Sequence, residues 1–226
     1  MLFEKKEYKE RLTKVKAAMQ KKGIDLLVSH DPANMNYLTG YDAWSFYYAQ
    51  CVLVHVKEDE PICFLRAQDV GGAYIKTYLN DKNIIRYDEK YIHTWPLHPY
   101  QYLVEIIKER KWDKSNIGLE MDSHYFTAFC YETIKDGLPN AKVKDAERLV
   151  NWVRVIKSDA EIKLNISDAD ALFVSCTALP ALEILEEVEK KVKKLVLSSN
   201  QTLIWDTIRS VGYKSPIQGY GKLLRN

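Results

Sequence analysis

Residues 34–50 read NMNYLTGYDAWSFYYAQ, and the rest of the chain can be organised around this stretch. It contains six aromatic residues, one glycine and a single charge, and apolar runs at residues 24–28 and 51–56 flank it. Surface loops are normally polar, whereas aromatic side chains this dense belong to a core or to a binding surface. Neighbours within residues 44–48 point in different directions in any regular structure, so we expect some of these rings to face outward.

The composition excludes several classes of protein. The chain has 226 residues, 46% of them hydrophobic, which suits one domain with an extension or two small domains. Its net charge of +2 provides no overall attraction to nucleic acids or anionic membranes. No apolar run is long enough to span a membrane, and residues 1–12 lack the apolar core of a secretion signal. We therefore expect a cytoplasmic protein with no membrane or nucleic-acid partner, whose four scattered cysteines are buried free thiols.

Helix-like and strand-like segments alternate through residues 1–156. Residues 4–22 have helical periodicity and end at Gly23, while Asp31 followed by Pro32 is typical of a helix start. The charged residues 57–60 join two apolar strands into a hairpin, so the pattern predicts an α/β domain whose mixed β-sheet is flanked by helices. Further helices are expected over residues 31–40, 68–79, 98–111, 123–136 and 146–156, and strands over 24–29, 50–56, 61–66, 84–87, 116–120 and 141–144.

Three features, taken in order, resemble the N-terminal domain of the creatinase/prolidase/aminopeptidase P family. The first is the opening helix followed by GIDLLV (residues 23–28) and NYLTGY (residues 36–41). The second is NIGLE (residues 116–120), similar to the family's I-G-x-E strand. The third is RVIKSDAEI (residues 154–162), similar to the junction that leads into the family's catalytic domain, with Ser158 and Glu161 spaced as a capping box. Within the family, residues 41–50 resemble the creatinase and ectoine-hydrolase branch.

The resemblance implies a ribonuclease-H-like fold for residues 1–156 and leaves residues 157–226 as a short, mainly helical tail, truncated or divergent. Family members hydrolyse C–N bonds in a C-terminal domain that uses either two divalent metals or a histidine acting as base and acid. Both chemistries need a histidine, and the last one in this chain is His124. We therefore expect no catalytic residue, no metal and no cofactor, and a chain that is inactive by itself.

In the family, this N-terminal domain mediates dimer formation and closes the active site of the neighbouring subunit. In creatinase, an aromatic residue and an arginine that follow the glycine contact the substrate in that neighbour. Aligned without gaps from Gly40, these two positions fall on Phe46 and Tyr48. The resemblance thus implies a substrate gate in trans made of Phe46, Tyr48 and Trp44, in which the aromatic wall is kept and the cation is not. Such a wall excludes water and orients substrate without transferring a proton.

Three functions are compatible with the sequence. The first is a non-catalytic dimerisation and substrate-gating domain of a Xaa-Pro peptidase or creatinase-type hydrolase, in a homodimer. The second is an accessory subunit that forms a heterodimer with a full-length paralogue and completes its active site in trans. The third is a module that binds a peptide or a small molecule, and it requires the exposed aromatics at residues 44–48 to form a contiguous apolar patch.

The remaining motifs are weaker. Asp168 and Asp170 could share a cation if they lay on a strand, but we favour a solvated pair or a helix cap. His93 and His98 could bind zinc, but without an acidic or thiol partner nearby we favour surface or hydrogen-bonded histidines. Residues 181–196 predict one amphipathic helix, and the turn-rich residues 212–226 are expected to be loose. The tail could be a remnant of the family's catalytic domain.

Overall fold

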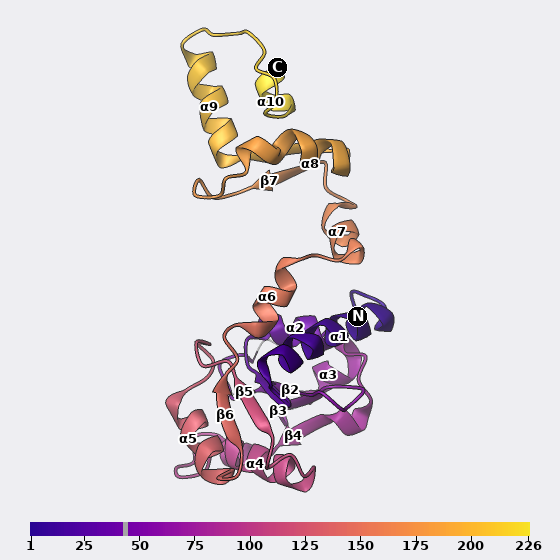
Figure 1. The fold of residues 1–226 in the computed structure, drawn as a ribbon, viewed down its shortest axis with the longest axis vertical. Coiled ribbons are helices and arrows are strands. Elements are labelled where there is room, and N and C mark those ends of the chain that lie inside the picture. Colours follow the sequence, from indigo (N-terminus) through magenta and orange to yellow (C-terminus); the bar gives the residue numbers. More distant parts are fainter. Residues whose placement is uncertain (43–44) are drawn as a thin grey trace. The chain divides into compact units, whose positions relative to one another are not determined.

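The computed structural model describes residues 1–42 and 45–226, without the side chains of residues 165 and 166. The chain divides into two compact units, unit 1 (residues 1–156) and unit 2 (residues 157–226). A sheet of six strands forms the centre of unit 1, and unit 2 contains a pair of strands (Figure 1). The described part of the chain has no helix that is both long and apolar enough to cross a bilayer.

Unit 1 has the mixed α/β architecture that the sequence predicts. Its strands follow the order β4-β3-β2-β1-β5-β6, in which β2 is antiparallel to both β1 and β3 while the other neighbours are parallel. The strands are β1 (Leu26–Ser29), β2 (Cys51–His55), β3 (Ile62–Arg66), β4 (Ile84–Tyr87), β5 (Asn116–Leu119) and β6 (Lys142–Asp145). The helices are α1 (Lys5–Lys22), α2 (Pro32–Thr39), α3 (Val70–Lys76), α4 (Pro99–Glu109), α5 (Ala128–Gly137) and α6 (Leu149–Val155).

Helices cover both faces of this sheet (Figure 1). Successive strand residues point to opposite faces, so Leu27 belongs to the core under α1, α2, α3 and α6, whereas Leu26 and Val28 belong to the core under α4 and α5. All three side chains are fully buried. The sheet is therefore the middle layer of a three-layer domain, and its loops emerge at the two ends of the strands.

Capping and turn residues in the sequence predicted most of the helix ends correctly. The Asp31 carboxylate accepts hydrogen bonds from the backbone N–H groups of Ala33 (2.9 Å) and Asn34 (3.1 Å), which starts α2 as predicted. Helix α5 was expected from residue 123 but begins at Ala128, where the Thr127 hydroxyl accepts the N–H of Cys130. Residues 121–127 instead form a loop, because the side chain of Phe126 packs into the core below α4 and α5.

Gly40 ends α2 in a conformation that only glycine adopts without strain. Its φ is +84°, and an added Cβ would lie 2.9 Å from the Tyr8 hydroxyl and 3.0 Å from the Lys76 carbonyl oxygen. We expect Gly40→Ala to lower the free energy of unfolding by about 2 kcal/mol, measured by urea denaturation. The matched control is Gly71→Ala in α3, where a Cβ meets nothing within 4 Å and helix propensity should raise stability by about 0.5 kcal/mol. Equal effects at both glycines would contradict this account.

Unit 2 departs from the predicted single helix over residues 181–196. Helix α8 (Leu185–Val192) ends where Lys193 adopts a φ of 56°, and residues 195–198 form strand β8. The helical spacing of apolar residues continues past Lys193, but the apolar residues 195–197 pair in parallel with β7 (Ala171–Val174). Asp168 and Asp170 precede β7 and do not lie on it. The remaining helices of unit 2 are α7 (Asp159–Ile166), which starts at the predicted Ser158–Glu161 capping box, α9 (Ser199–Ser210) and α10 (Lys222–Arg225).

Candidate functional site

Three segments of unit 1 bring aromatic side chains together at its surface. The ring centroid of Phe46, between α2 and β2, lies 5.8 Å from that of Tyr125, between β5 and α5. The Tyr48 ring lies 6.0 Å from that of His93, and the Trp95 ring lies 5.6 Å from that of Phe129. We call this set the aromatic surface; it consists of Phe46, Tyr47, Tyr48, Trp95, Tyr125 and Phe129.

The aromatic surface is open to solvent. Tyr47 is 63% exposed and Trp95 81% exposed, while Phe46 and Tyr125 are 39% and 38% exposed. Single exposed rings are ordinary, but rings in mutual contact form the kind of patch that binds other molecules. Two of the three residues predicted as a substrate gate, Phe46 and Tyr48, lie here, and Trp44 lies outside the described residues.

A cation does lie beside Tyr48, although it comes from elsewhere in the sequence. The guanidinium of Arg66, at the end of β3, lies 4.1 Å from the Tyr48 ring centroid. Its Nε and Nη2 donate to the Glu89 carboxylate at 3.0 and 2.7 Å. Because Glu89 already binds this guanidinium, Arg66 supports the Tyr48 ring and is not free to bind a substrate carboxylate. Sequence reasoning missed Arg66 because only strand pairing brings it near the loop.

A buried carboxylate holds the segment that leads to the aromatic surface. Glu120 follows β5 and is 5% exposed, and burial raises the pKa of its carboxyl group. One oxygen accepts the Ser29 hydroxyl (2.7 Å) and the Asn34 amide (2.8 Å), and the other accepts the N–H groups of His30 (2.6 Å) and Asp31 (3.0 Å). These four bonds fix the end of β1 and the start of α2 against β5.

The same network reaches α6. The Asn34 side-chain amide also donates to Asn151 (2.9 Å), and its oxygen accepts a hydrogen bond from Arg154 (2.7 Å). Asn34 lies between the GIDLLV and NYLTGY motifs, Glu120 ends the NIGLE motif and Arg154 begins the junction. Residues in or beside all three features of the family resemblance therefore meet in one place. The sequence alone contained all three residues but offered no signal that they touch.

The two histidines considered for zinc have other contacts. His98 caps α4, with its Nδ1 accepting the Tyr100 N–H at 3.1 Å, and its Nε2 lies 3.9 Å from the sulfur of Cys130. His93 packs against Tyr48. Across residues 1–42 and 45–226, no three His, Cys, Asp or Glu side chains gather closely enough to hold a metal ion.

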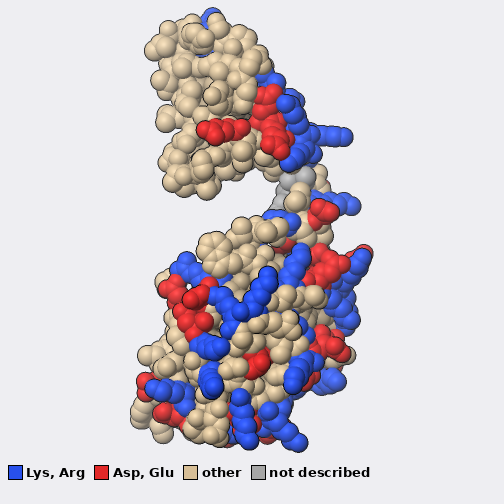
Figure 2. Space-filling view, in the orientation of Figure 1, with Lys and Arg blue, Asp and Glu red and all other residues tan. Residues whose placement is uncertain are grey.

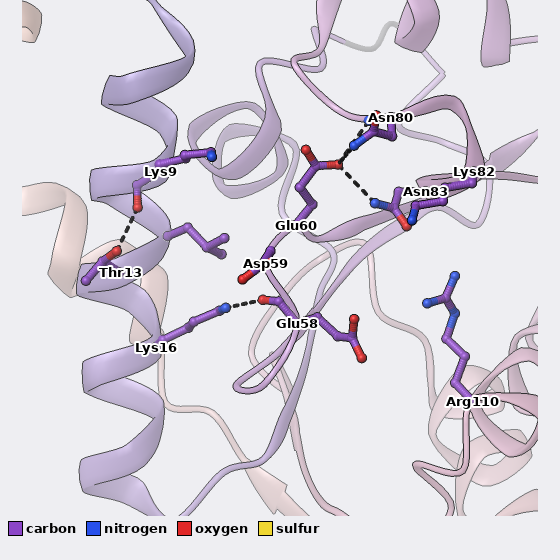
Figure 3. A pocket seen from close by; sticks show the side chains of 11 residues that line it. Lys9, Thr13, Lys16, Glu58, Asp59, Glu60, Asn80, Lys82, Asn83 and Arg110 are labelled. Atoms are coloured by element: carbon purple, nitrogen blue, oxygen red, sulfur yellow. Dashed lines mark hydrogen bonds between the residues drawn. The ribbon is translucent and has the colours of Figure 1, made fainter.

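Another cavity lies between α1 and the hairpin turn of β2 and β3 (Figure 3). It measures about 640 Å³ and is lined by charges of both signs. The Glu60 carboxylate faces it but is already bound to Lys5, Asn80 and Asn83; burial opposes its charge, yet these hydrogen bonds lower its pKa to about 2. Acidic and basic side chains also mix over the face of unit 1 drawn in Figure 2. This cavity is a solvated polar groove, and the aromatic surface is the better candidate site.

Comparison with known families agrees with this architecture. Residues 11–156 match the family model described as the creatinase/prolidase N-terminal domain. That match spans more than half of the chain. The chain belongs to the creatinase/prolidase N-terminal domain family. The fold and the resemblance predicted from the sequence are therefore confirmed for unit 1, which we call the creatinase-type domain from here on.

Two relatives resemble the creatinase-type domain in sequence. The ectoine hydrolase of Halomonas elongata is 44% identical over 162 residues, which cover 71% of this chain and 40% of that protein. An uncharacterised hydrolase/peptidase of Sinorhizobium fredii is 42% identical over 160 residues, covering 71% of this chain and 41% of that protein. The chain thus spans about two fifths of the length of the curated relatives it matches.

Solved structures show the same fold. A proline dipeptidase from Streptococcus pneumoniae superimposes with a TM-score of 0.52 at 19% identity, covering 65% of this chain and 98% of that one. The N-terminal domain of an X-Pro dipeptidase from Streptococcus pyogenes gives a TM-score of 0.51 at 17% identity, covering 66% of this chain and 99% of that one. In both cases the match covers nearly all of the solved chain and about two thirds of this one.

A second family model matches residues 128–224, and it is described as arylmalonate decarboxylase. Unit 2 lies almost entirely within this match. Its two parallel strands end at the same edge, where Cys176 follows β7 with a φ of 94° and donates its backbone N–H to the Ser199 hydroxyl at 3.2 Å. Ser199 opens α9 directly after β8. In open α/β sheets, this carboxyl edge is where reactive groups gather.

Cys176 should be the one cysteine that reacts quickly in the native protein. It is exposed, whereas Cys51, Cys63 and Cys130 are buried, and a thiol must be accessible to attack a reagent. We expect one thiol per chain to react with Ellman's reagent before unfolding and four after denaturation in guanidinium chloride. The Cys176→Ser variant should lose the fast reaction and keep three slow thiols. Two or more fast thiols in the native chain would contradict the burial of the other cysteines.

Proposed function

We propose that the creatinase-type domain is a dimerisation and substrate-gating domain of a hydrolase related to ectoine hydrolase and creatinase, acting in the cytoplasm. The aromatic surface supports this proposal, because Phe46 is exposed on it in contact with Tyr125, and the half-buried Tyr48 lies two residues further along the same loop. The 44% identity to an ectoine hydrolase supports the same class of reaction for the whole enzyme. The domain supplies shape and water exclusion, and the bond cleavage takes place in a catalytic domain that another polypeptide segment contributes.

The test is a chimera in which residues 1–156 replace the matching N-terminal part of the Halomonas elongata ectoine hydrolase. Residues 1–156 have their own two-sided core, and a dipeptidase N-terminal domain of this fold exists as a separate solved chain. We expect the chimera to hydrolyse ectoine, and Phe46→Ala to raise KM by about tenfold. The control is Tyr74→Ala, another exposed aromatic residue, on α3. Unchanged kcat and KM in the Phe46→Ala chimera would refute the gating role.

The isolated chain should hydrolyse neither ectoine nor a Xaa-Pro dipeptide, with or without manganese, cobalt or zinc. Turnover that follows the protein through metal-free repurification would refute this expectation. A heterodimer with a full-length paralogue is the alternative to a homodimer, and light scattering on mixtures of the two chains separates these assemblies.

The match of unit 2 to the decarboxylase model favours a second candidate function for that unit. We propose that unit 2 derives from an α/β domain of that type and that Cys176, at its carboxyl edge, is the group that would transfer a proton to a substrate carbanion. Phenylmalonate is the substrate to try, with carbon dioxide release as the readout. Release that Cys176→Ser abolishes would support this function, and no release from the intact chain would refute it.

A further inference from the structure

Phe46 has an aromatic partner across the aromatic surface that the sequence did not indicate. We infer that Tyr125 is the second wall of the gate, and that Phe46 and Tyr125 together set which substrate fits. This inference rests on the proposed gating function. The two rings meet edge to face, with centroids 5.8 Å apart and planes at 77°, and each keeps more than a third of its surface exposed. An edge-to-face pair of this kind presents two aromatic surfaces, at an angle to each other, to a ligand.

The loop that carries Tyr125 is anchored below its exposed ring. The Tyr125 N–H donates to the Ser123 hydroxyl at 3.3 Å, and the Phe126 N–H donates to the Ser123 carbonyl at 3.1 Å. The next ring, Phe126, stacks on the buried His30 ring with centroids 4.4 Å apart. Because neighbouring contacts hold the loop, placing Tyr125 against a ligand costs little conformational entropy.

The residues that precede Tyr125 in the chain line a small polar cavity. Asp122, Ser123 and His124, which directly precede Tyr125, line a space of about 150 Å³ together with Asn34 and Glu120. One loop therefore carries an exposed aromatic ring and, on the residues just before it in sequence, hydrogen-bonding groups that line a cavity. This combination suits a small cyclic molecule with one apolar face and a polar edge, and it would discriminate against a purely apolar one.

The experiment uses the same chimera with Tyr125→Ala, Tyr125→Phe and the double variant Phe46→Ala/Tyr125→Ala. We expect Tyr125→Ala to raise KM for ectoine about threefold to tenfold with a smaller change in kcat, while Tyr125→Phe keeps the wild-type KM because the ring is retained. The double variant should raise KM less than the product of the two single effects, because the rings act as a pair. Melting temperatures check that a change in KM does not come from unfolding.

The outcomes separate this inference from the proposed function. If Phe46→Ala raises KM and Tyr125→Ala leaves it within twofold of wild type, the Tyr125 wall is overturned and the gate stands. If neither variant changes KM, the gating function itself fails. If the chimera does not turn over ectoine, calorimetric titration with ectoine decides: binding weakened by Tyr125→Ala supports the inference, and no binding by the unmodified chimera overturns it.

Discussion

Replacing Glu120 by alanine should lower the free energy of unfolding of the creatinase-type domain by about 3–5 kcal/mol. The substitution leaves the Ser29 hydroxyl, the N–H groups of His30 and Asp31 and one bond of the Asn34 amide without their acceptor in a buried place. A buried donor without a partner costs more than its hydrogen bond contributes, because it has also lost its contact with water. Because several donors lose their acceptor at once, we expect Glu120→Ala to lower the free energy of unfolding of this domain more than any other single substitution we propose.

Urea denaturation of the full chain measures this effect, with Glu132→Ala on the exposed side of α5 as the matched control. We expect the control to change stability by less than 0.5 kcal/mol, as surface substitutions usually do. Glu120→Gln should fall between wild type and alanine, since the amide can accept bonds only through its oxygen. If Glu120→Ala costs no more than the control, the four hydrogen bonds do not stabilise the fold as we describe.

Acid should destabilise the creatinase-type domain largely through His30. This ring is fully buried between Phe126 and Tyr100, neither ring nitrogen has a hydrogen-bond partner among the described residues, and burial lowers its pKa from 6.5 to about 3. Between pH 6.5 and pH 3 the unfolded chain binds a proton at His30 and the folded chain does not, so stability falls as pH falls. The slope rises to about 1.4 kcal/mol per pH unit once the unfolded-state histidine is protonated, which makes roughly 2 kcal/mol between pH 6.5 and pH 4.5.

The measurement compares the pH dependence of unfolding for wild type and His30→Leu. We expect the variant to lose most of the acid-induced destabilisation between pH 6.5 and pH 4.5, while His124→Leu, at an exposed histidine, keeps the wild-type slope. Groups that titrate equally in wild type and variant cancel in this comparison. Parallel stability curves for wild type and His30→Leu would show that His30 takes up its proton in the folded state and would contradict its burial.

Unit 2 matches a different family model from the creatinase-type domain. The sequence indicated a truncated or divergent tail there, which could be a remnant of the hydrolase's catalytic domain. The family model that matches residues 128–224 is described as arylmalonate decarboxylase, and the two strands of unit 2 pair in parallel. The creatinase-type domain and unit 2 therefore match different families within one chain. Experiments on each unit should therefore be interpreted separately.

Short-range interactions made much of the creatinase-type domain predictable from the sequence alone. Asp31 caps α2, and Gly23 and Gly40 end two helices, each through bonds between residues a few positions apart. In unit 2, the capping box of Ser158 and Glu161 starts α7 in the same way. Short apolar runs likewise indicated the strands, because strands of a sheet that helices cover on both faces are apolar along their length. The aromatic character of the loop after Gly40 was equally visible, since it is a property of consecutive residues.

Only the tertiary structure decided which distant residues meet. Sheet pairing brings Arg66 to Tyr48 and the β5 loop brings Tyr125 to Phe46, while Glu120 joins β1 and α2. Residues 195–198 continue a helical pattern but form a strand, because β7 offers backbone partners that no local signal records. Contacts across long sequence separations depend on how the layers pack, so the sequence determined the elements and the loop chemistry, and packing determined the candidate site.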